Sequence, residues 1–319
     1  SPAIQGYYDQ FPNVDTFNGT ASFVDNHTVA IALNDGTSVT LTGDKIFIAT
    51  GGRTNIPALP GLAEAGYVTS ESFFGPSYPK KPYQSLIIIG GGPIGCEFAH
   101  VFDAAGTKVT MVQHNVRLLP KEDPAVSAFI LKQFQRYGMD IRLNKDTVSV
   151  SQRDGLKVLS FRDRTSGEEG EVAAEEILVA PGIRPMTELL HLENTDVRLD
   201  KRGYIETNEF LETTAPNIWA LGDVNGLAPF RHKANYEAEI GEVARQCGYE
   251  SIYAFCRFFR KRSGNMALGR LRCGTGRHLH LSRSGPCRPD RRPGPEERLR
   301  RRKGHQPLFI IGQGLRHGL

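Results

Sequence analysis

Cysteine is scarce, and the few cysteines share no spacing. The chain of 319 residues has five of them, Cys96, Cys247, Cys256, Cys273 and Cys287. Their number is odd, and no two have the C-x2-C or C-x4-C spacing of a zinc site or a redox dithiol. The sequence therefore indicates neither a disulfide framework nor a zinc site, and we predict no metal centre.

Long apolar runs are also missing, and we expect no secretory signal. No run approaches the ~18 apolar residues that suggest a membrane span. The first residues, Ser1-Pro-Ala-Ile4, have neither a basic n-region nor an apolar h-region. We expect no membrane partner and, by default, a cytoplasmic location.

Acidic residues become rare only near the end of the chain. Residues 1–256 hold 22 Lys+Arg and 32 Asp+Glu, whereas residues 257–319 hold 17 and 3, and 15 of those 17 are Arg. The stretches 287–295 and 298–303 carry too little apolar surface to offset the entropy of ordering them. We predict a basic, disordered tail over residues 246–319.

The N-terminal part has the pattern of a small β meander. Short β-rich runs at 20–24, 28–33, 37–41 and 45–49 are separated by Asp-Asn and Asp-Gly turns. The last run, Lys45-Ile-Phe-Ile-Ala49, is apolar and ends at Thr50-Gly51-Gly52. It is typical of a buried strand that leads into a linker.

From Ser85 onward strands and helices alternate, which predicts a parallel sheet with crossover helices. We expect strands at 86–89, 108–112 and 176–180, others near Ile141, Val148 and Val158, and a helix over 94–105. A second helix follows Asp123, and its spacing places four apolar residues on one inward face. These residues are Val126, Phe129, Ile130 and Phe134.

A complete G-x-G-x-x-G motif, Gly90-Gly91-Gly92-Pro93-Ile94-Gly95, lies between the first strand and helix of this part. The first glycine permits a tight turn, the second lets the backbone approach a pyrophosphate, and the third lets helix and strand pack closely. The N–H groups and the positive dipole end of the helix then suit an anion. Because the motif lies between a strand and a helix, a glycine-rich turn that binds no ligand is the weaker interpretation.

The acid that usually binds the NAD ribose is absent at the end of the second strand. Gln113 stands there, followed by His114, Asn115 and Arg117. Without a carboxylate a 2′-phosphate is not repelled, and Arg117 or a protonated His114 would attract one, which favours tolerance of NADPH. The alternative is that Gln113 hydrogen-bonds an NAD ribose while Arg117 is solvated.

Four motifs in order resemble those of the pyridine nucleotide-disulfide oxidoreductases, over about residues 16–245. They are Ala49-Thr-Gly-Gly-Arg53 with Pro57 and Pro60-Gly61, the glycine motif continued by Cys96-Glu97-Phe-Ala, Ala180-Pro-Gly182-Ile-Arg184-Pro, and Thr213-Thr-Ala-Pro-Asn-Ile-Trp-Ala-Leu-Gly222-Asp223. Dihydrolipoamide dehydrogenase-like and mercuric reductase-like members are the most similar in pattern. The resemblance implies FAD and NAD or NADP as cofactors, with hydride passing from NAD(P)H to the flavin.

The resemblance also implies an α/β fold in which a Rossmann-like NAD(P) domain, 80–195, is inserted into a partial FAD-binding domain, 1–79 and 196–245. It implies a set of NAD(P) residues, in which Glu97 lies by the nicotinamide. They are Gly90, Gly91, Gly92, Pro93, Ile94, Gly95, Glu97, Gln113, His114, Val148 and Gly182. The implied FAD residues are Ala21, Thr50, Gly51, Gly52, Gly222, Asp223, Phe230, Arg231 and His232.

Three features of the family have no counterpart here: an N-terminal G-x-G-x-x-G, the C-x4-C dithiol and a C-terminal His-x4-Glu. We therefore expect an incomplete, inactive form that holds flavin weakly. The basic tail stands where the family has its dimerisation domain, so dimerisation of this chain is doubtful. Its composition favours a frameshift near residues 245–265 over a natural tail that binds nucleic acid, because it lacks aromatic spacing for base stacking.

Two functional classes follow from these observations. The first is an FAD-dependent NAD(P)H oxidoreductase of the disulfide reductase type. The second is a nucleotide-binding module or a basic nucleic-acid-associated protein without redox activity.

Overall fold

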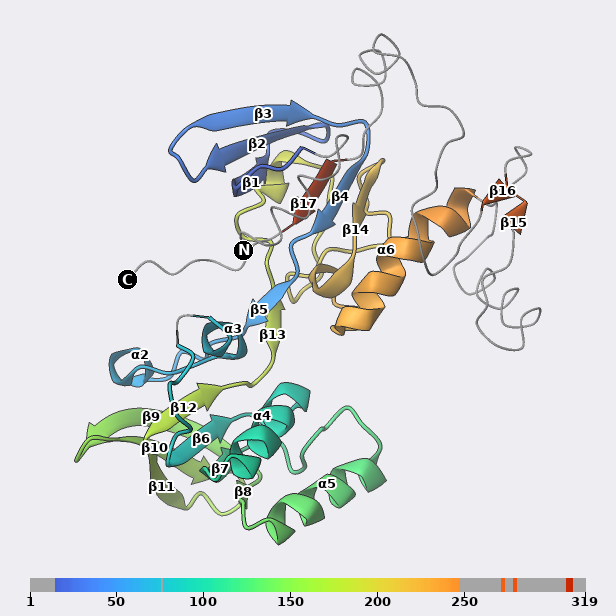
Figure 1. Ribbon diagram of the computed structural model, residues 1–319. Coiled ribbons are helices and arrows are strands. Elements are labelled where there is room, and N and C mark those ends of the chain that lie inside the picture. Colours follow the sequence, from blue (N-terminus) through green and yellow to red (C-terminus); the bar gives the residue numbers. More distant parts are fainter. Residues whose placement is uncertain (1–14, 76, 247–270, 273–277, 280–307, 312–319) are drawn as a thin grey trace. The chain divides into compact units, whose positions relative to one another are not determined.

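The structure, a computed structural model, describes residues 15–75, 77–246, 271–272, 278–279 and 308–311. It contains two compact units (Figure 1). The second is the continuous stretch Arg53–Arg184, and the first combines Ser1–Gly52 with Pro185–His317. The chain leaves the first unit through β5 (Gly52–Thr54) and returns through β13 (Ile183–Pro185), and these two strands pair with each other.

A four-stranded parallel sheet forms the centre of the second unit, in the order β12-β6-β7-β8. Its strands are β6 (Ser85–Ile89), β7 (Lys108–Val112), β8 (Asp140–Arg142) and β12 (Glu176–Val179). Helix α4 (Pro93–Ala104) connects β6 to β7, and α5 (Pro124–Arg136) connects β7 to β8. The predicted α/β fold class, with its Rossmann-like alternation of strands and crossover helices, is confirmed.

Strand β6 contributes to two separate cores, because successive side chains of a strand lie on opposite faces. Leu86 and Ile88 belong to the core that contains Phe98 of α4. Ile87 and Ile89 belong to another core, which includes residues of an antiparallel sheet. That sheet consists of β9 (Lys145–Arg153), β10 (Leu156–Asp163) and β11 (Glu169–Ala174), in the order β11-β10-β9. The parallel sheet is thus the middle layer of three (Figure 1).

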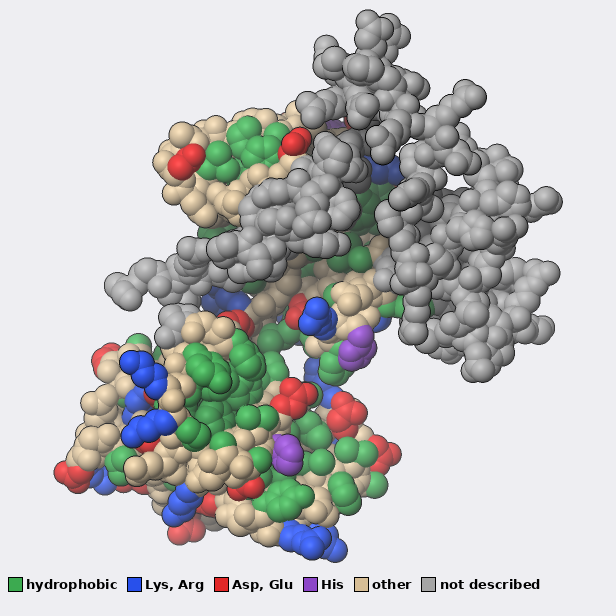
Figure 2. Space-filling view, viewed as in Figure 1, with side chains coloured by type: hydrophobic (Ala, Val, Ile, Leu, Met, Phe, Trp, Pro, Cys, Tyr) green, Lys and Arg blue, Asp and Glu red, His purple; other side chains and the backbone are tan. Residues whose placement is uncertain are grey.

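Helix α5 is present as predicted, but its predicted inward face is only partly right. Phe134 is buried and Ile130 packs against the core, whereas Val126 and Phe129 are 46% and 60% exposed. Ser127 is buried instead, so the inward stripe is displaced around the helix from the predicted one. Apolar side chains consequently remain on the surface of the second unit among charges of both signs (Figure 2).

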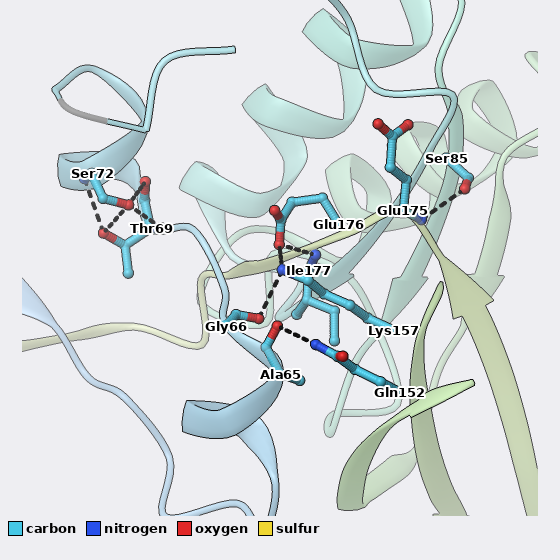
Figure 3. Close-up of polar contacts among 10 residues, drawn as sticks. All are labelled: Ala65, Gly66, Thr69, Ser72, Ser85, Gln152, Lys157, Glu175, Glu176 and Ile177. Carbon is cyan, nitrogen blue, oxygen red and sulfur yellow. Dashed lines mark hydrogen bonds and ion pairs between the residues drawn. The ribbon is translucent and has the colours of Figure 1, made fainter. Parts of the chain in front are cut away.

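The segment that follows β5 packs on the sheets of the second unit, to which it belongs, and carries the short helices α2 (Leu62–Ala65) and α3 (Ser70–Phe73). Gln152 Nε2 donates to the Ala65 carbonyl at 3.2 Å (Figure 3). Lys157 Nζ donates to the Gly66 carbonyl at 2.9 Å and also pairs with Glu176. These contacts explain why the structure divides at 52/53, whereas the sequence placed this boundary at 79/80.

The other boundary also differs between structure and sequence. Leu190 and Leu192 pack in the core of the first unit together with Phe23. The division into compact units therefore falls at 184/185, whereas the sequence placed the end of the NAD(P) domain at 195/196. The assignment of one nucleotide to each predicted domain stays a prediction.

The first unit contains the predicted meander and a small parallel sheet. The meander is antiparallel and consists of β1 (Gly19–Phe23), β2 (Thr28–Leu33) and β3 (Ser38–Thr42). The fourth β run, β4 (Ile46–Ala49), instead joins β14 (Ile218–Ala220) and β17 (Leu308–Ile311) in the order β14-β4-β17, with both pairs parallel. The return segment continues through η1 (Leu192–Asn194), η2 (Gly222–Asn225) and α6 (Arg231–Gln246).

Strand β17 lies within the predicted tail over 246–319. Its residues pair with β4 from Leu308 opposite Ile46 to Ile311 opposite Ala49. The run Leu-Phe-Ile-Ile is rich in residues that favour strands, which explains its pairing. Strands β15 (Leu271–Arg272) and β16 (His278–Leu279) also pair. The rest of the predicted tail beyond Gln246 lies outside the described residues.

The described helices are at most 16 residues long, the length of α6. None of the helices in the described ranges is long and apolar enough to cross a membrane. Within the same ranges no three His, Cys, Asp or Glu side chains are grouped so as to hold a metal ion.

Candidate dinucleotide sites

The glycine-rich loop joins β6 to α4, and its glycines serve different geometric needs. Gly90 has a φ of +111°, and a Cβ there would come within 2.3 Å of the Ala180 carbonyl oxygen. A Cβ on Gly95 would lie 2.2 Å from the Gly90 carbonyl oxygen. Gly92 has extended backbone, and a Cβ there would meet nothing within 4 Å. Packing therefore requires glycine at 90 and 95, whereas Gly92 borders open space.

The first turn of α4 has hydrogen-bond donors for a negatively charged ligand. The N–H groups of Ile94 and Gly95 lie in this turn, where a helix provides no intrahelical acceptor. No acidic residue occurs in the turn. The positive end of the dipole of this twelve-residue helix lies at the same point. The arrangement suits a diphosphate.

Three neighbouring strands of the second unit end at the same edge of the parallel sheet. Gly90 follows β6, Gln113 follows β7, and Gly182, with a φ of +141° and open space at its Cβ position, follows β12. The Gly90 N–H donates to the Val112 carbonyl at 2.9 Å. The carboxyl ends of parallel strands are where open α/β sheets bind ligands. The structure thus brings these predicted NAD(P) residues together.

Gln113 has a structural task that the sequence did not reveal. Its side-chain Oε1 accepts the Gly91 N–H at 3.0 Å, and its Nε2 donates to the Arg117 carbonyl at 3.2 Å. The residue is only 5% exposed. Both ends of the amide are therefore used to fasten the glycine-rich loop to the loop after β7. His114, the next residue, is exposed, and its Nδ1 lies 2.7 Å from Asp146 Oδ1.

Three further residues near this site differ in their exposure. Glu97 is exposed on α4, and Val148 is 37% exposed on β9. Cys96 is buried on α4, and burial, with a smaller contribution from the Glu97 charge, raises the pKa of its thiol to about 12. A thiol with so high a pKa is unreactive at neutral pH, which fits a small buried residue of the core.

The first unit has a comparable edge, where β4 and β14 run parallel. Thr50 and Gly51 follow β4, and Gly222 and Asp223 follow β14. The Leu221 N–H donates to the Ile48 carbonyl at 3.0 Å, which continues the pairing to the ends of the strands. Predicted FAD residues from distant parts of the sequence therefore lie at one edge.

Glu237 holds the turn after β14, and sequence analysis missed it. Its Oε2 accepts the Gly222 N–H at 2.8 Å and the Asn225 Nδ2 at 3.2 Å, while Lys233, one turn earlier in α6, pairs with its Oε1. The Glu237 side chain is 2% exposed. The only sequence signal was the i, i+4 spacing of Lys233 and Glu237, which is also typical of a solvated helix face.

Asp223 lies in this turn with a half-buried side chain. Burial raises the pKa of its carboxyl, and the nearby Glu237 charge raises it further. Among the described residues no hydrogen-bond donor contacts the Asp223 carboxylate. A carboxylate with these properties suits a ligand hydroxyl, because a hydroxyl can donate the missing hydrogen bond.

The other predicted FAD residues have mixed environments. Thr50 is buried, and its hydroxyl donates to the Met186 carbonyl at 2.8 Å, so it fastens the return segment. Ala21 is half-buried on β1, and Gly52 begins β5. The rings of Phe230 and His232 stack with their centroids 5.6 Å apart, and Arg231, the first residue of α6, is exposed. The roles assigned to all of these residues stay predictions.

Comparisons with known proteins agree with the motif analysis. The family model described as pyridine nucleotide-disulphide oxidoreductase matches residues 4–245. A probable pyridine nucleotide-disulfide oxidoreductase from Escherichia coli, RclA, is 34% identical over 221 residues, which are 69% of this chain and 48% of the relative. A mercuric reductase from Staphylococcus aureus is 34% identical over 71% of this chain and 40% of its own length.

A dihydrolipoyl dehydrogenase from Mycobacterium tuberculosis is 33% identical over 71% of this chain and 48% of its own. The chain thus spans about half the length, or less, of these curated relatives. Among solved structures, the Cu(II) complex of the flavoprotein disulfide reductase RclA from E. coli has a TM-score of 0.69 and 31% identity, covering 78% of this chain and 54% of that one. The predicted family is confirmed: the chain belongs to the pyridine nucleotide-disulphide oxidoreductases.

Proposed function

We propose that the second unit binds NAD(P)H at the Gly90–Gly95 loop, that the first unit binds FAD around Asp223, and that hydride passes from NAD(P)H to the flavin. The observation that carries the proposal is the loop after β6. Its Gly92 borders open space at the mouth of a helix whose first turn has donors and no acid. The loop also lies within the region, residues 4–245, that matches the pyridine nucleotide-disulphide oxidoreductase family.

The residues present fit both dinucleotides. Gly92 leaves room that a Cβ would fill, and the Ile94 and Gly95 N–H groups can donate to phosphate oxygens. Asp223 supplies an acceptor for the hydroxyls of a ribityl chain. When bound, the flavin would supply the acceptor for the nicotinamide hydride. The proposal concerns this hydride step alone.

The experiment is anaerobic titration of the purified chain, loaded with FAD and freed of unbound flavin, with NADH or NADPH. We expect the visible absorbance of the flavin to bleach. Retained binding of NADH without bleaching would instead support a nucleotide-binding module without redox activity. A sample that is folded by circular dichroism yet gives no calorimetric heat with either dinucleotide would refute the proposal.

Replacing Asp223 with Asn tests the first unit separately. The raised pKa of Asp223 means that the folded state holds the proton more tightly than the unfolded state does. Stability therefore falls as pH rises from the ordinary pKa of 3.8 through the raised folded value, and the cost persists at neutral pH. We expect Asp223→Asn to unfold at a higher urea concentration than the parent at pH 7, and to retain less flavin.

Asp200, in the same unit, provides a control of opposite sign. Burial alone would raise the pKa of its carboxyl, but N–H donors from Tyr204 and Arg202 lower it overall. Asp200→Asn should therefore lose stability at neutral pH and keep its flavin. If Asp223→Asn behaves in the same way as Asp200→Asn, Asp223 has a structural role and not the proposed binding role.

A further inference from the structure

The end of β7 lacks the acid that selects NAD, and Gln113 cannot replace it. Its amide is engaged at both ends, with the Gly91 N–H at 3.0 Å and the Arg117 carbonyl at 3.2 Å. The Arg117 side chain is also directed back to its own loop, because its Nη2 donates to the Pro120 carbonyl at 2.7 Å. Neither residue is therefore a ready partner for the 2′ position of a ribose.

The carboxylate of Asp146, on β9 of the antiparallel sheet, lies beside the end of β7. The Gln113 N–H donates to the Arg142 carbonyl at 2.9 Å, and the Lys145 N–H donates to the Gln113 carbonyl at 3.0 Å. These bonds hold the first residues of β9 beside the end of β7. Asp146, the second residue of β9, is placed there, with its Oδ1 2.7 Å from His114 Nδ1.

The charges around Asp146 favour a hydroxyl over a phosphate. His114 contacts Asp146 Oδ1, and Arg164 Nε lies 3.4 Å from the same oxygen. A 2′-phosphate would have to compete with a carboxylate for both side chains and would meet like-charge repulsion. The second oxygen of Asp146 has no bond among the described residues, and the side chain is 52% exposed. A 2′-hydroxyl can donate to it.

We propose that Asp146 takes the part of the missing acid and makes the second unit selective for NADH over NADPH. The proposal rests on the proposed function, since it concerns the ribose of a dinucleotide bound at the Gly90–Gly95 loop. It reverses the preference that the sequence suggested, because the sequence did not show that Asp146 lies beside His114. Asp146 is a specificity-determining residue in this proposal and takes no part in hydride transfer.

The test is calorimetric titration of the full chain with NADH and with NADPH at fixed salt. We expect the parent to bind NADH at least tenfold more tightly than NADPH, since a hydrogen bond to a charged group contributes about this much. In Asp146→Asn the affinity for NADH should fall about tenfold while that for NADPH holds or rises. The matched control is Glu171→Gln, which removes an exposed carboxylate that pairs with Arg153 at the far end of β9.

The outcomes distinguish the proposed role of Asp146 from the proposed binding of NAD(P)H at the Gly90–Gly95 loop. Absence of heat with both dinucleotides in the parent and in Glu171→Gln refutes the proposed function itself. Binding of NADPH as tight as that of NADH in the parent, or an unchanged NADH affinity in Asp146→Asn, overturns the role of Asp146 alone. Circular dichroism of each variant establishes that the affinities compare folded proteins.

Discussion

Replacing Gly92 with alanine should leave the chain folded and weaken its binding of NADH at least tenfold. The backbone at Gly92 is extended, with φ −79° and ψ −175°, so alanine can adopt it without strain. The added methyl group would meet no protein atom within 4 Å. It would instead occupy the space that the proposed diphosphate needs. Calorimetry with NADH measures the loss, and circular dichroism establishes the fold.

Gly95→Ala is the contrasting variant, because its methyl group meets the protein itself. The Cβ would lie 2.2 Å from the Gly90 carbonyl oxygen, so β6 and α4 would have to separate. We expect Gly95→Ala to lower stability as well as binding, by about 1–3 kcal/mol in the free energy of unfolding. If Gly92→Ala binds NADH as the parent does, the ligand does not approach this loop, and the proposed site is wrong.

Replacing Glu237 with alanine should destabilise the first unit by about 2–4 kcal/mol. The variant leaves the buried Gly222 N–H and the Asn225 amide without their shared acceptor, and Lys233 without its counter-charge. The chain has one tryptophan, Trp219, which is 1% exposed in β14. Its fluorescence during urea unfolding therefore reports on the unit that contains Glu237.

Two variants define what Glu237 contributes. Glu237→Gln keeps an acceptor oxygen and should lose about half as much stability. Glu209→Ala removes an exposed carboxylate of the same unit and should change the unfolding midpoint little. If Glu237→Ala has the same unfolding midpoint in urea as Glu209→Ala, the role given to the buried carboxylate is wrong. We also expect Glu237→Ala to retain less flavin, because the turn that carries Asp223 loses its anchor.

Sequence patterns predicted the features that local chemistry determines. The run Leu86-Ile-Ile-Ile89 and the glycines after it predicted β6, the tight turn and α4, because each depends on residues close in the chain. The order of four motifs predicted the family. The face of α5 was predicted less well, since apolar residues at 126, 129 and 130 allow more than one inward stripe.

Features that depend on distant partners were missed. The alternative in which Gln113 hydrogen-bonds a ribose rested on its place after β7, and the sequence did not show that its amide accepts the Gly91 N–H. Glu237 lies 14 residues after Asp223 in a helix rich in charge, so nothing local distinguishes it from a solvated residue. Asp146 and His114 are 32 residues apart, and their contact follows from the pairing of backbone segments.

The parallel sheet of the first unit also bears on the order in which the chain folds during synthesis. Its strands begin at residues 46, 218 and 308, whereas the second unit is one uninterrupted stretch from 53 to 184. The second unit can therefore complete its core while the ribosome is still translating. The β4 edge that β17 covers must wait until residues 308–311 emerge, and during that interval its backbone groups are open to pairing with other chains.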